Sequence, residues 1–317
     1  MSGKIRTKVL RVILSTSLGA LVLLSVTVMV SIFNIRNTTL AQSDQLGAEA
    51  ARSSQVALEA QVRQQIISLA EDKAALADEK LTTIQNQTKM VADIASHIFT
   101  YRAQYSPRRI DYLQVGQEGT VPHLSSAPGF SLPEFRNEVY LAANVSDMLR
   151  QMMVVDIGIM GSYIGTEDGY SIVVERDAYP NETDYDARTR GWYKGARDAG
   201  GIFWTDIFTD AVSKQAAISC AMPFYDLSGG RRVFKGVAGN GTLLSASVNK
   251  IIDSTKIGET GYAFVLNAKG QVIFTPKSAD MITDEAGNII GEDYLNSTNP
   301  AIRELAQRML SRESGIM

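Results

Sequence analysis

Residues 161–175 read GSYIGTEDGYSIVVE, and this stretch decides the fold class. Its two halves are rich in β-branched and aromatic residues, and Glu167-Asp168-Gly169 between them is a turn sequence. The pattern predicts an antiparallel hairpin. A second hairpin is predicted where AAISCAMPFYD and RRVFKGVAG flank the turn residues 227–230.

Residues 105–245 combine these two hairpins with a helical segment. Proline and glycine punctuate the stretch from Tyr105 to Pro133, which is typical of loop. Pro133 suits the first turn of a helix that we expect to run to about Met153, with Ser131 as its N-terminal cap. A helix followed by several antiparallel strands predicts an α+β lobe over roughly residues 105–245.

Residues 246–317 repeat this plan at smaller size. SVNKIIDSTKI, residues 247–257, predicts a short helix, and GYAFVLN and QVIFTP flank a turn at Ala268-Lys269-Gly270. Apolar residues at helical spacing predict an amphipathic helix from Pro300 to Leu310. We therefore expect two related α+β lobes, each with a central antiparallel sheet, the first larger than the second.

Residues 12–33 form an apolar run without a charge. At about 1.5 Å per residue, a helix of that length crosses a hydrocarbon layer of roughly 30 Å. Basic residues crowd positions 4–11, which favours the cytoplasm for residues 1–11 and places residues from about 34 onward outside the membrane. A cleaved signal peptide is the alternative, although its apolar core is usually shorter.

A long stalk helix is predicted over residues 38–104. Between Ala48 and Ser106 the sequence contains neither glycine nor proline and is rich in strong helix formers. Apolar residues, among them Ile84, Val91 and Ile98, recur with a period of about 3.5 residues and some slips. A coiled-coil stalk and a rod that carries displacement both fit this pattern. A parallel homodimer is the expected assembly.

The composition disfavours several classes of function. A net charge of −3 over 317 residues gives no reason to expect a nucleic acid partner. The single cysteine, Cys220, lies in an apolar run, so we expect a small buried side chain and neither an internal disulfide nor a thiolate metal cluster. The two histidines, His97 and His123, lack metal-site spacing. We expect no metal, no cofactor and no catalytic residues, and hence no enzyme in this chain.

Residues 184–196, DYDARTRGWYKGA, gather arginine, tyrosine and tryptophan beside a predicted loop. Arg190 beside Trp192 is consistent with a cation–π pair that closes a core and with a wall that contacts a ligand. In an extended segment the neighbours Trp192 and Tyr193 would face opposite sides. We expect at least one of them in the core and Trp192 toward a pocket.

The order of these elements resembles the double Cache sensor domain of bacterial transmembrane receptors, which include chemoreceptors, sensor kinases, cyclases and membrane phosphatases. The resemblance covers about residues 40–317 and rests most on RTRGWYKGA, residues 188–196, and GETGYAFVLN, residues 258–267. It implies two PAS-like lobes along the long helix, the larger one distal to the membrane and ligand-binding. It also implies that a second membrane span and an output domain, such as a serine phosphatase, follow residue 317.

Family members that sense amino acids carry a tyrosine, an arginine five residues on, and Trp-Tyr after one spacer. Tyr185, Arg190, Trp192 and Tyr193 reproduce that spacing. The resemblance implies that Arg190 and the ring N–H of Trp192 hold a ligand carboxylate. Guanidinium and indole N–H groups are suitable donors for that purpose.

Two positions depart from the family pattern. Phe208 stands where a further tyrosine is expected, which keeps the ring and loses the hydroxyl. Asn240-Gly241 stands where an aspartate that grips the ligand ammonium is expected after Gly-Val-x-Gly. A buried ammonium without a counter-charge costs several kcal/mol. We therefore expect weak binding of ordinary α-amino acids, with carboxylates that lack an ammonium as alternatives. Phe208 and Asn240 complete the predicted ligand-binding set.

The predicted function is therefore the extracytoplasmic ligand-sensing region of a bacterial membrane receptor. It binds a small carboxylate-bearing molecule in residues 105–245 and passes a conformational change across the membrane to a cytoplasmic output domain. The alternative is a membrane-anchored coiled-coil protein, structural or adhesive, whose globular head binds another protein. The expected location is the cytoplasmic membrane.

Overall fold

The computed structural model describes residues 2–114, 117, 119–176, 185–210, 216–244, 257, 261–267, 269–274, 282–283, 289–290 and 292–311. Residues 1–66 form one unit and residues 67–317 a second. The helix predicted at residues 247–257 lies, except for Ile257, outside the described residues.

The first unit consists of the N-terminal part of helix α1. This helix spans Ser2–Thr100 as a single element and includes the predicted apolar run at residues 12–33. From Leu21 onward the helix contains a segment long and apolar enough to cross a membrane by length and composition. Its apolar side chains are exposed, with Leu23 at 68% and Met29 at 74%. Exposed leucine and methionine in such a run are what a lipid-facing helix requires.

In the second unit, the C-terminal part of α1 packs against a sheet. Ile84, Val91 and Ile98, spaced by seven residues, are all buried, which confirms the predicted apolar face in this part of the helix. The helix ends at Thr100, a few residues before the predicted end at 104, and a 3₁₀ turn follows at Arg102–Gln104.

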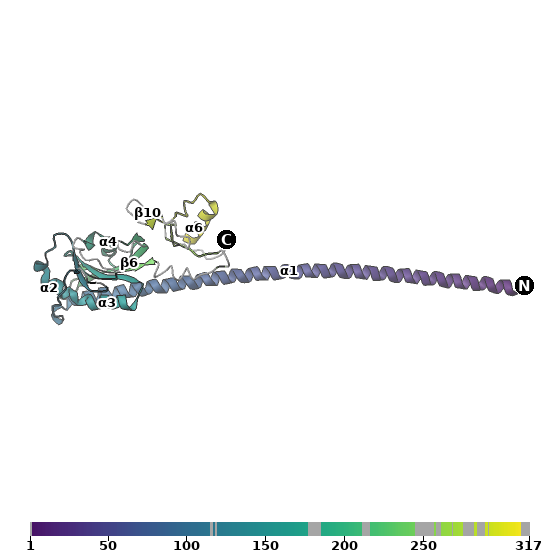
Figure 1. Cartoon of the computed structure of the whole chain (residues 1–317), viewed down its shortest axis with the longest axis horizontal. Helices are drawn as coiled ribbons and strands as arrows, with labels where there is room; N and C mark the ends of the chain where they lie inside the picture. The colour runs from purple at the N-terminus through teal and green to yellow at the C-terminus, as the bar shows by residue number, and fades with distance from the viewer. Residues whose placement is uncertain are drawn as a thin grey trace. The chain divides into compact units, whose positions relative to one another are not determined.

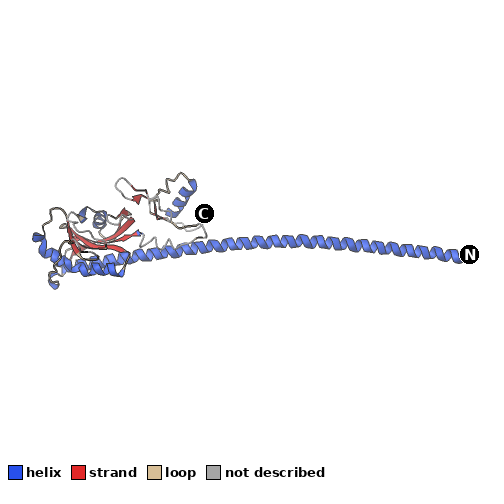
Figure 2. Cartoon of the chain, viewed as in Figure 1, coloured by secondary structure: helices blue, strands red, loops and turns tan. Residues whose placement is uncertain are grey.

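A seven-stranded antiparallel sheet forms the centre of the larger lobe (Figure 2). Its strand order is β1-β3-β2-β7-β6-β4, and β5 also pairs with β6. The strands are β1 His123–Ser126, β2 Ile159–Thr166, β3 Tyr170–Glu175, β4 Phe203–Trp204, β5 Phe208–Thr209, β6 Ala216–Asp226 and β7 Val233–Leu243. Both predicted hairpins are present as β2–β3 and β6–β7. Strand β1 was not predicted, because prolines surround it in sequence.

Helices cover both faces of this sheet (Figure 1). The predicted helix at 133–153 is divided into α2 Leu132–Ala142, a 3₁₀ turn Ala143–Val145 and α3 Ser146–Val155. Ser131 occupies the N-cap position of α2, but its side chain makes no capping hydrogen bond. Helices α1, α2 and α3 contribute to the core on one face, and α4 Gly191–Ala199 packs on the other.

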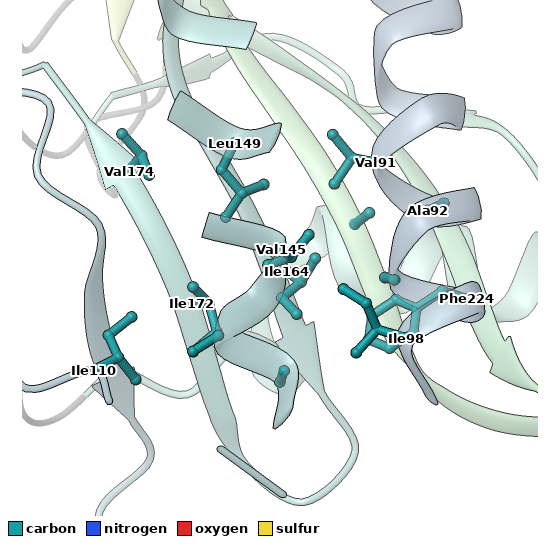
Figure 3. Packing of buried hydrophobic residues seen from close by; sticks show 14 of the residues in the cluster. Val91, Ala92, Ile98, Ile110, Val145, Leu149, Ile164, Ile172, Val174 and Phe224 are labelled. Atoms are coloured by element: carbon teal, nitrogen blue, oxygen red, sulfur yellow. The ribbon is translucent and has the colours of Figure 1, made fainter. Parts of the chain in front are cut away.

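The main core lies between α1, α3 and the first of these faces. Figure 3 shows Val91 and Ile98 of α1 and Leu149 of α3 among strand residues such as Ile164 and Ile172, and all five are at most 1% exposed. Alternate residues of a strand point to opposite faces. Residues 163 and 165 therefore point toward α4, on the face that carries the candidate site.

The smaller lobe contains short two-stranded elements and one helix among its described residues. Strands β8 Val265–Leu266 and β9 Val272–Phe274 pair antiparallel, which confirms the predicted hairpin, and β10 Ile282–Thr283 pairs with β11 Ile289–Ile290. Helix α6 spans Pro300–Leu310, as predicted, and the side chain of Asn299 caps it. The mixed architecture confirms the α+β fold class.

The two predicted lobes contact each other through the β5–β6 end of the sheet. Ile207 and Ile218 pack in one cluster with Ala263 and Val265. Lys269, in the β8–β9 turn, forms a 2.7 Å salt bridge with Asp206. This contact joins the strands of the larger lobe directly to the hairpin of the smaller one.

Candidate functional site

The RGWYKGA segment forms the start of helix α4, Gly191–Ala199, which packs on the sheet. Its C-terminal residue is followed by Gly200 in the left-handed conformation, φ 64°, which ends the helix. Trp192, Tyr193 and Ala196 are its buried residues. Gly195 lies against the ring of Phe203, where a Cβ atom would collide with that ring. The absence of a side chain at position 195 lets the helix approach strand β4 closely.

The expectation of an extended segment at Trp192 and Tyr193 is wrong, because both residues lie in the first turn of α4. Neighbours on a helix are separated by about 100° rather than 180°, so both can face the sheet. Trp192 is 7% exposed and Tyr193 is fully buried.

Tyr185, Arg190 and Trp192 come together at the N-terminal end of α4. The indole Nε1 of Trp192 donates a hydrogen bond to the Tyr185 hydroxyl at 3.2 Å. The guanidinium carbon of Arg190 lies 4.6 Å from the centre of the Tyr185 ring, within cation–π range. Arg190 itself is exposed. Three of the predicted ligand contacts are thus neighbours in space.

Tyr193 is held in the core of this face. Its hydroxyl donates to Glu167 Oε2 at 3.1 Å, and its ring stands edge-on to Phe234. Burial, followed by the negative charge of Glu167, raises the pKa of Tyr193 well above its ordinary value. Tyr193 therefore supports the position of α4 and keeps its hydroxyl protonated.

Tyr163 on β2 is a central residue of this face and was not predicted as a site residue. Its ring packs 4.7 Å from the Trp192 ring, centre to centre, and its hydroxyl lies 3.0 Å from Ser219 Oγ on β6. Burial raises the pKa of Tyr163 well above its ordinary value, with Tyr185 as the next cause. The alternation of GSYIG identifies one face of β2, but only the strand pairing shows that this face meets α4.

Phe208 lies on the same face of the sheet, closer to the smaller lobe. It pairs with Ala217 of β6, and directly paired residues of antiparallel strands point to one face. Ser219 and Ala221 follow Ala217 along that face. Phe208 is half-buried, so its ring is available near the end of β6.

Asn240 lies on the opposite face. Its side-chain nitrogen donates to Thr88 Oγ1 of α1 at 2.9 Å, and Asn240 is fully buried. The adjacent Gly241 lies on the α4 face of the sheet, since neighbouring residues of a strand alternate between the two faces. The structure therefore does not bring Asn240 together with Tyr185, Arg190 and Trp192, and we remove it from the candidate site.

Arg188, the other arginine of the segment, is held by a carboxylate. Its Nε and one terminal nitrogen donate hydrogen bonds to the Asp186 carboxylate, at 2.9 and 3.0 Å. Hydrogen bonding to Arg188 lowers the pKa of Asp186. Within the described part of the chain, no group of three or more histidine, cysteine, aspartate or glutamate side chains could hold a metal ion.

Comparison with known proteins identifies the family. The model of the Cache domain family dCache_1 matches residues 54–302, most of the chain. The chain belongs to this family.

Two curated relatives are chemotaxis proteins. The chain is 36% identical over 117 residues to the methyl-accepting chemotaxis protein PscA of Pseudomonas syringae and 32% identical over 115 residues to PctB of Pseudomonas aeruginosa. These matches cover 37% and 36% of this chain, and they span only 18% and 17% of the two relatives.

Similar solved structures are ligand-binding domains of chemoreceptors. That of Pseudomonas aeruginosa PctC with GABA superimposes with a TM-score of 0.44 and 20% identity over 68% of this chain and 77% of that one. That of Campylobacter jejuni Tlp3 with L-norvaline gives a TM-score of 0.47 and 19% identity, over 68% of each chain.

Proposed function

We propose that this chain is the ligand-sensing region of a bacterial membrane receptor and binds a small carboxylate-bearing molecule on the α4 face of its larger sheet. The observation that carries the proposal is the group of Tyr185, Arg190 and Trp192 at the start of α4. Membership of the Cache domain family and the names of the chemotaxis relatives support a sensor role.

Arg190 is the cationic group of this site. Among the described residues no carboxylate forms a salt bridge with it, whereas Arg188, two residues earlier, is fully engaged by Asp186. The guanidinium rests on the Tyr185 ring and keeps its donors exposed. A planar group with several N–H donors is suited to bind a carboxylate through two parallel hydrogen bonds.

The Trp192 and Tyr185 pair supplies further polar groups beside Arg190. The Tyr185 hydroxyl accepts a hydrogen bond from the indole of Trp192, so both polar groups lie beside the Arg190 guanidinium. Tyr163 and Phe208 line the same face of the sheet and give it an aromatic surface. Apolar walls with a few polar groups are typical of small-molecule sites.

The remaining parts of the proposal concern the whole receptor. Residues 12–33 would anchor the chain in the cytoplasmic membrane, with residues from about 34 onward outside the cell or in the periplasm. Residues 105–245 would form the membrane-distal lobe and residues 246–317 the membrane-proximal lobe. The receptor would act as a homodimer, with a second span and an output domain beyond residue 317.

Signalling requires that the ligand bind one arrangement of the lobes better than another. The contact of Ile207 and Ile218 with Ala263 and Val265 offers a route, because it joins the sheet that carries the site to the smaller lobe. A ligand that shifts β5 or β6 would alter this contact.

Isothermal titration of the full chain in detergent against a panel of small carboxylates tests the proposal. Arg190→Ala should lower the affinity for a carboxylate that binds by about tenfold to a hundredfold, as expected for loss of a charge-assisted pair. Arg197→Ala is the matched control, since Arg197 is an exposed arginine on the same helix, paired with Asp198. Equal effects of the two substitutions, or no binding by any carboxylate, would contradict the proposal.

A further inference from the structure

A cluster of charged side chains lies where helix α2 meets the turn between β2 and β3. Lys235 Nζ of β7 is 3.4 Å from the Glu138 carboxylate of α2 and 3.7 Å from that of Asp168 in the turn. Two carboxylates therefore share one ammonium group. The side chains are partly buried, with Lys235 17% and Glu138 21% exposed. Because little water separates charges in such a place, they interact more strongly than they would on the open surface.

Arg102, which follows α1, adds a second cation to this cluster. It lies 3.8 Å from Glu138 and 3.3 Å from Asp226 of β6. Although burial opposes it, hydrogen bonds from Ser228 and the charge of Arg102 lower the pKa of Asp226, so this carboxylate stays ionised. Three carboxylates thus face two cations in the cluster. One negative charge is in excess, and the binding of one proton would neutralise it.

A buried hydroxyl lies beside the same carboxylates. Tyr170 of β3 is fully buried, and its hydroxyl has no hydrogen-bond partner among the residues that the structure describes. Burial, followed by the negative charges of Glu138 and Asp168, raises the pKa of Tyr170 well above its ordinary value. The hydroxyl therefore stays protonated. A phenol can donate to an ionised carboxylate and accept from a protonated one, so Tyr170 can serve Glu138 in both states.

Glu138 is the carboxylate of the cluster that is best placed to hold a proton. Burial, followed by a hydrogen bond with Asp168, raises the pKa of Glu138 above its ordinary value, and the charges of Lys235 and Arg102 offset part of this effect. A protonated carboxyl donates to an ionised neighbour, whereas two ionised carboxylates repel each other. The closeness of Glu138 and Asp168 thus favours one shared proton.

We propose that Glu138 and Asp168 form a proton-binding site, and that the larger lobe responds to pH through it. This input is separate from the small-molecule site proposed above and does not depend on it. In the protonated form the pair holds α2 against the β2–β3 turn. In the ionised form the two carboxylates repel each other, and the turn moves away from α2.

The β2–β3 turn joins this pair to the α4 face. Asp168 follows Glu167, whose carboxylate accepts a hydrogen bond from the Tyr193 hydroxyl of α4 at 3.1 Å. The amide of Glu167 donates to the Lys235 carbonyl at 2.9 Å, so the turn is also bonded to the strand that carries the ammonium group. A displacement of the turn would therefore alter the packing of α4 on the sheet.

Infrared difference spectra of the full chain in detergent, recorded from about pH 4 to about pH 9, test the proton site. Glu138→Gln keeps the shape of the side chain and cannot ionise, so it should remove one component of the protonated-carboxyl signal. The midpoint of that component should lie above the ordinary glutamate value of about 4.3. Glu134→Gln is the matched control at an exposed glutamate one turn earlier in α2, and it should leave this component in place.

Substitutions of the two neighbours should move the midpoint in opposite directions. Asp168→Asn removes a negative charge beside Glu138 and should lower its proton affinity by about threefold to tenfold. Lys235→Gln removes a positive charge 3.4 Å away and should raise the proton affinity by a similar factor. Residues that only hold the fold together would not produce shifts of opposite sign.

The emission of Trp192, with Trp204→Phe as background, tests the response of the lobe. It should change with the midpoint of Glu138, and Glu138→Gln should remove this transition. The proposal is overturned if Glu138→Gln removes no component above the ordinary range, or if the two neighbour substitutions do not shift the midpoint in opposite directions. It is also overturned if the emission follows pH identically with and without Glu138. These outcomes do not involve carboxylate binding at Arg190, so the proposed function is tested separately.

Discussion

Asn240 of β7 and Thr88 of α1 form a buried hydrogen bond, 2.9 Å from Nδ2 to Oγ1, between the long helix and the middle of the sheet. The Thr88 hydroxyl in turn donates to the carbonyl of Ile84, one turn earlier in α1. Both residues are fully buried. This buried polar contact favours the observed register of the helix against the strand, because a shift would leave the Asn240 amide nitrogen without its acceptor.

Thr88→Val is expected to destabilise the larger lobe by about 1–3 kcal/mol, since valine has the same shape and leaves the Asn240 amide without its acceptor. Urea unfolding followed by circular dichroism measures the change.

Thr83→Val is the matched control: Thr83 lies on the same helix, is exposed and makes the same kind of bond to the carbonyl four residues earlier. It should change stability by less than about 0.5 kcal/mol. Equal losses in the two variants would contradict the role of this contact.

The position of Asn240 also shows what the sequence could predict and what it could not. The hairpins and the buried face of α1 were predicted because they depend on local turns and on periodicity. Which of Asn240 and Gly241 faces the site depends on strand register, since a shift of one residue reverses the face. Register of β7 is set by pairing with β2 and β6, which are distant in sequence from the Arg190 segment.

The same reason explains why Tyr163 was not predicted as a site residue. Tyr163 belongs to the hairpin that decides the fold, and the alternation of its strand is visible in GSYIG. Its contact with Trp192 arises only when β7 and β6 extend the sheet and α4 packs on it. The helix at Gly191–Ala199 was itself missed, because its two glycines and its short length give a weak helical pattern.

Gly165→Ala is expected to displace α4 from the sheet. A Cβ atom at position 165 would lie 2.7 Å from Ala187 Cβ and 3.0 Å from the edge of the Trp192 ring. Overpacking of this kind typically costs about 1–3 kcal/mol. With Trp204→Phe as background, the emission of Trp192 should shift to longer wavelength as the indole becomes more exposed. Gly191→Ala, which has no neighbour within 4 Å of its Cβ position, is the control and should retain the emission maximum.

Mild acid is expected to weaken the larger lobe through His123 on β1. Burial lowers the pKa of His123, and a hydrogen bond with the Val121 carbonyl offsets part of the effect. The unfolded chain takes up a proton near pH 6.5, whereas the native imidazole does so only at lower pH. The unfolded state therefore binds more protons in this window, and the free energy of unfolding falls as the pH falls below about 6.5.

Urea unfolding at pH 7 and pH 5 measures this loss. His123→Gln should reduce the difference between the two pH values, and His97→Gln, at the exposed histidine of α1, shows whether the other histidine contributes. A pH dependence identical in wild type and His123→Gln would contradict the assignment.

Native-state labelling of Cys220 should report unfolding of the lobe that carries the candidate site. Cys220 is the single cysteine of the chain, is fully buried in β6, and has a thiol whose pKa burial raises to about 11. Both inaccessibility and the low thiolate fraction slow reaction with a disulfide reagent. Labelling at neutral pH should therefore be at least about a hundredfold slower in the native chain than in urea, with Cys220→Ala as the unlabelled control.

When labelling requires opening of the lobe, a ligand that binds the native state slows it by a factor of 1 + [L]/Kd. The same assay thus measures ligand affinity, and Arg190→Ala should reduce the slowing by a given carboxylate concentration, as expected for a Kd raised about tenfold to a hundredfold, without changing the rate in its absence. Fast labelling of the native chain would instead show that β6 opens locally, and it would contradict the rigid sheet on which the site is built.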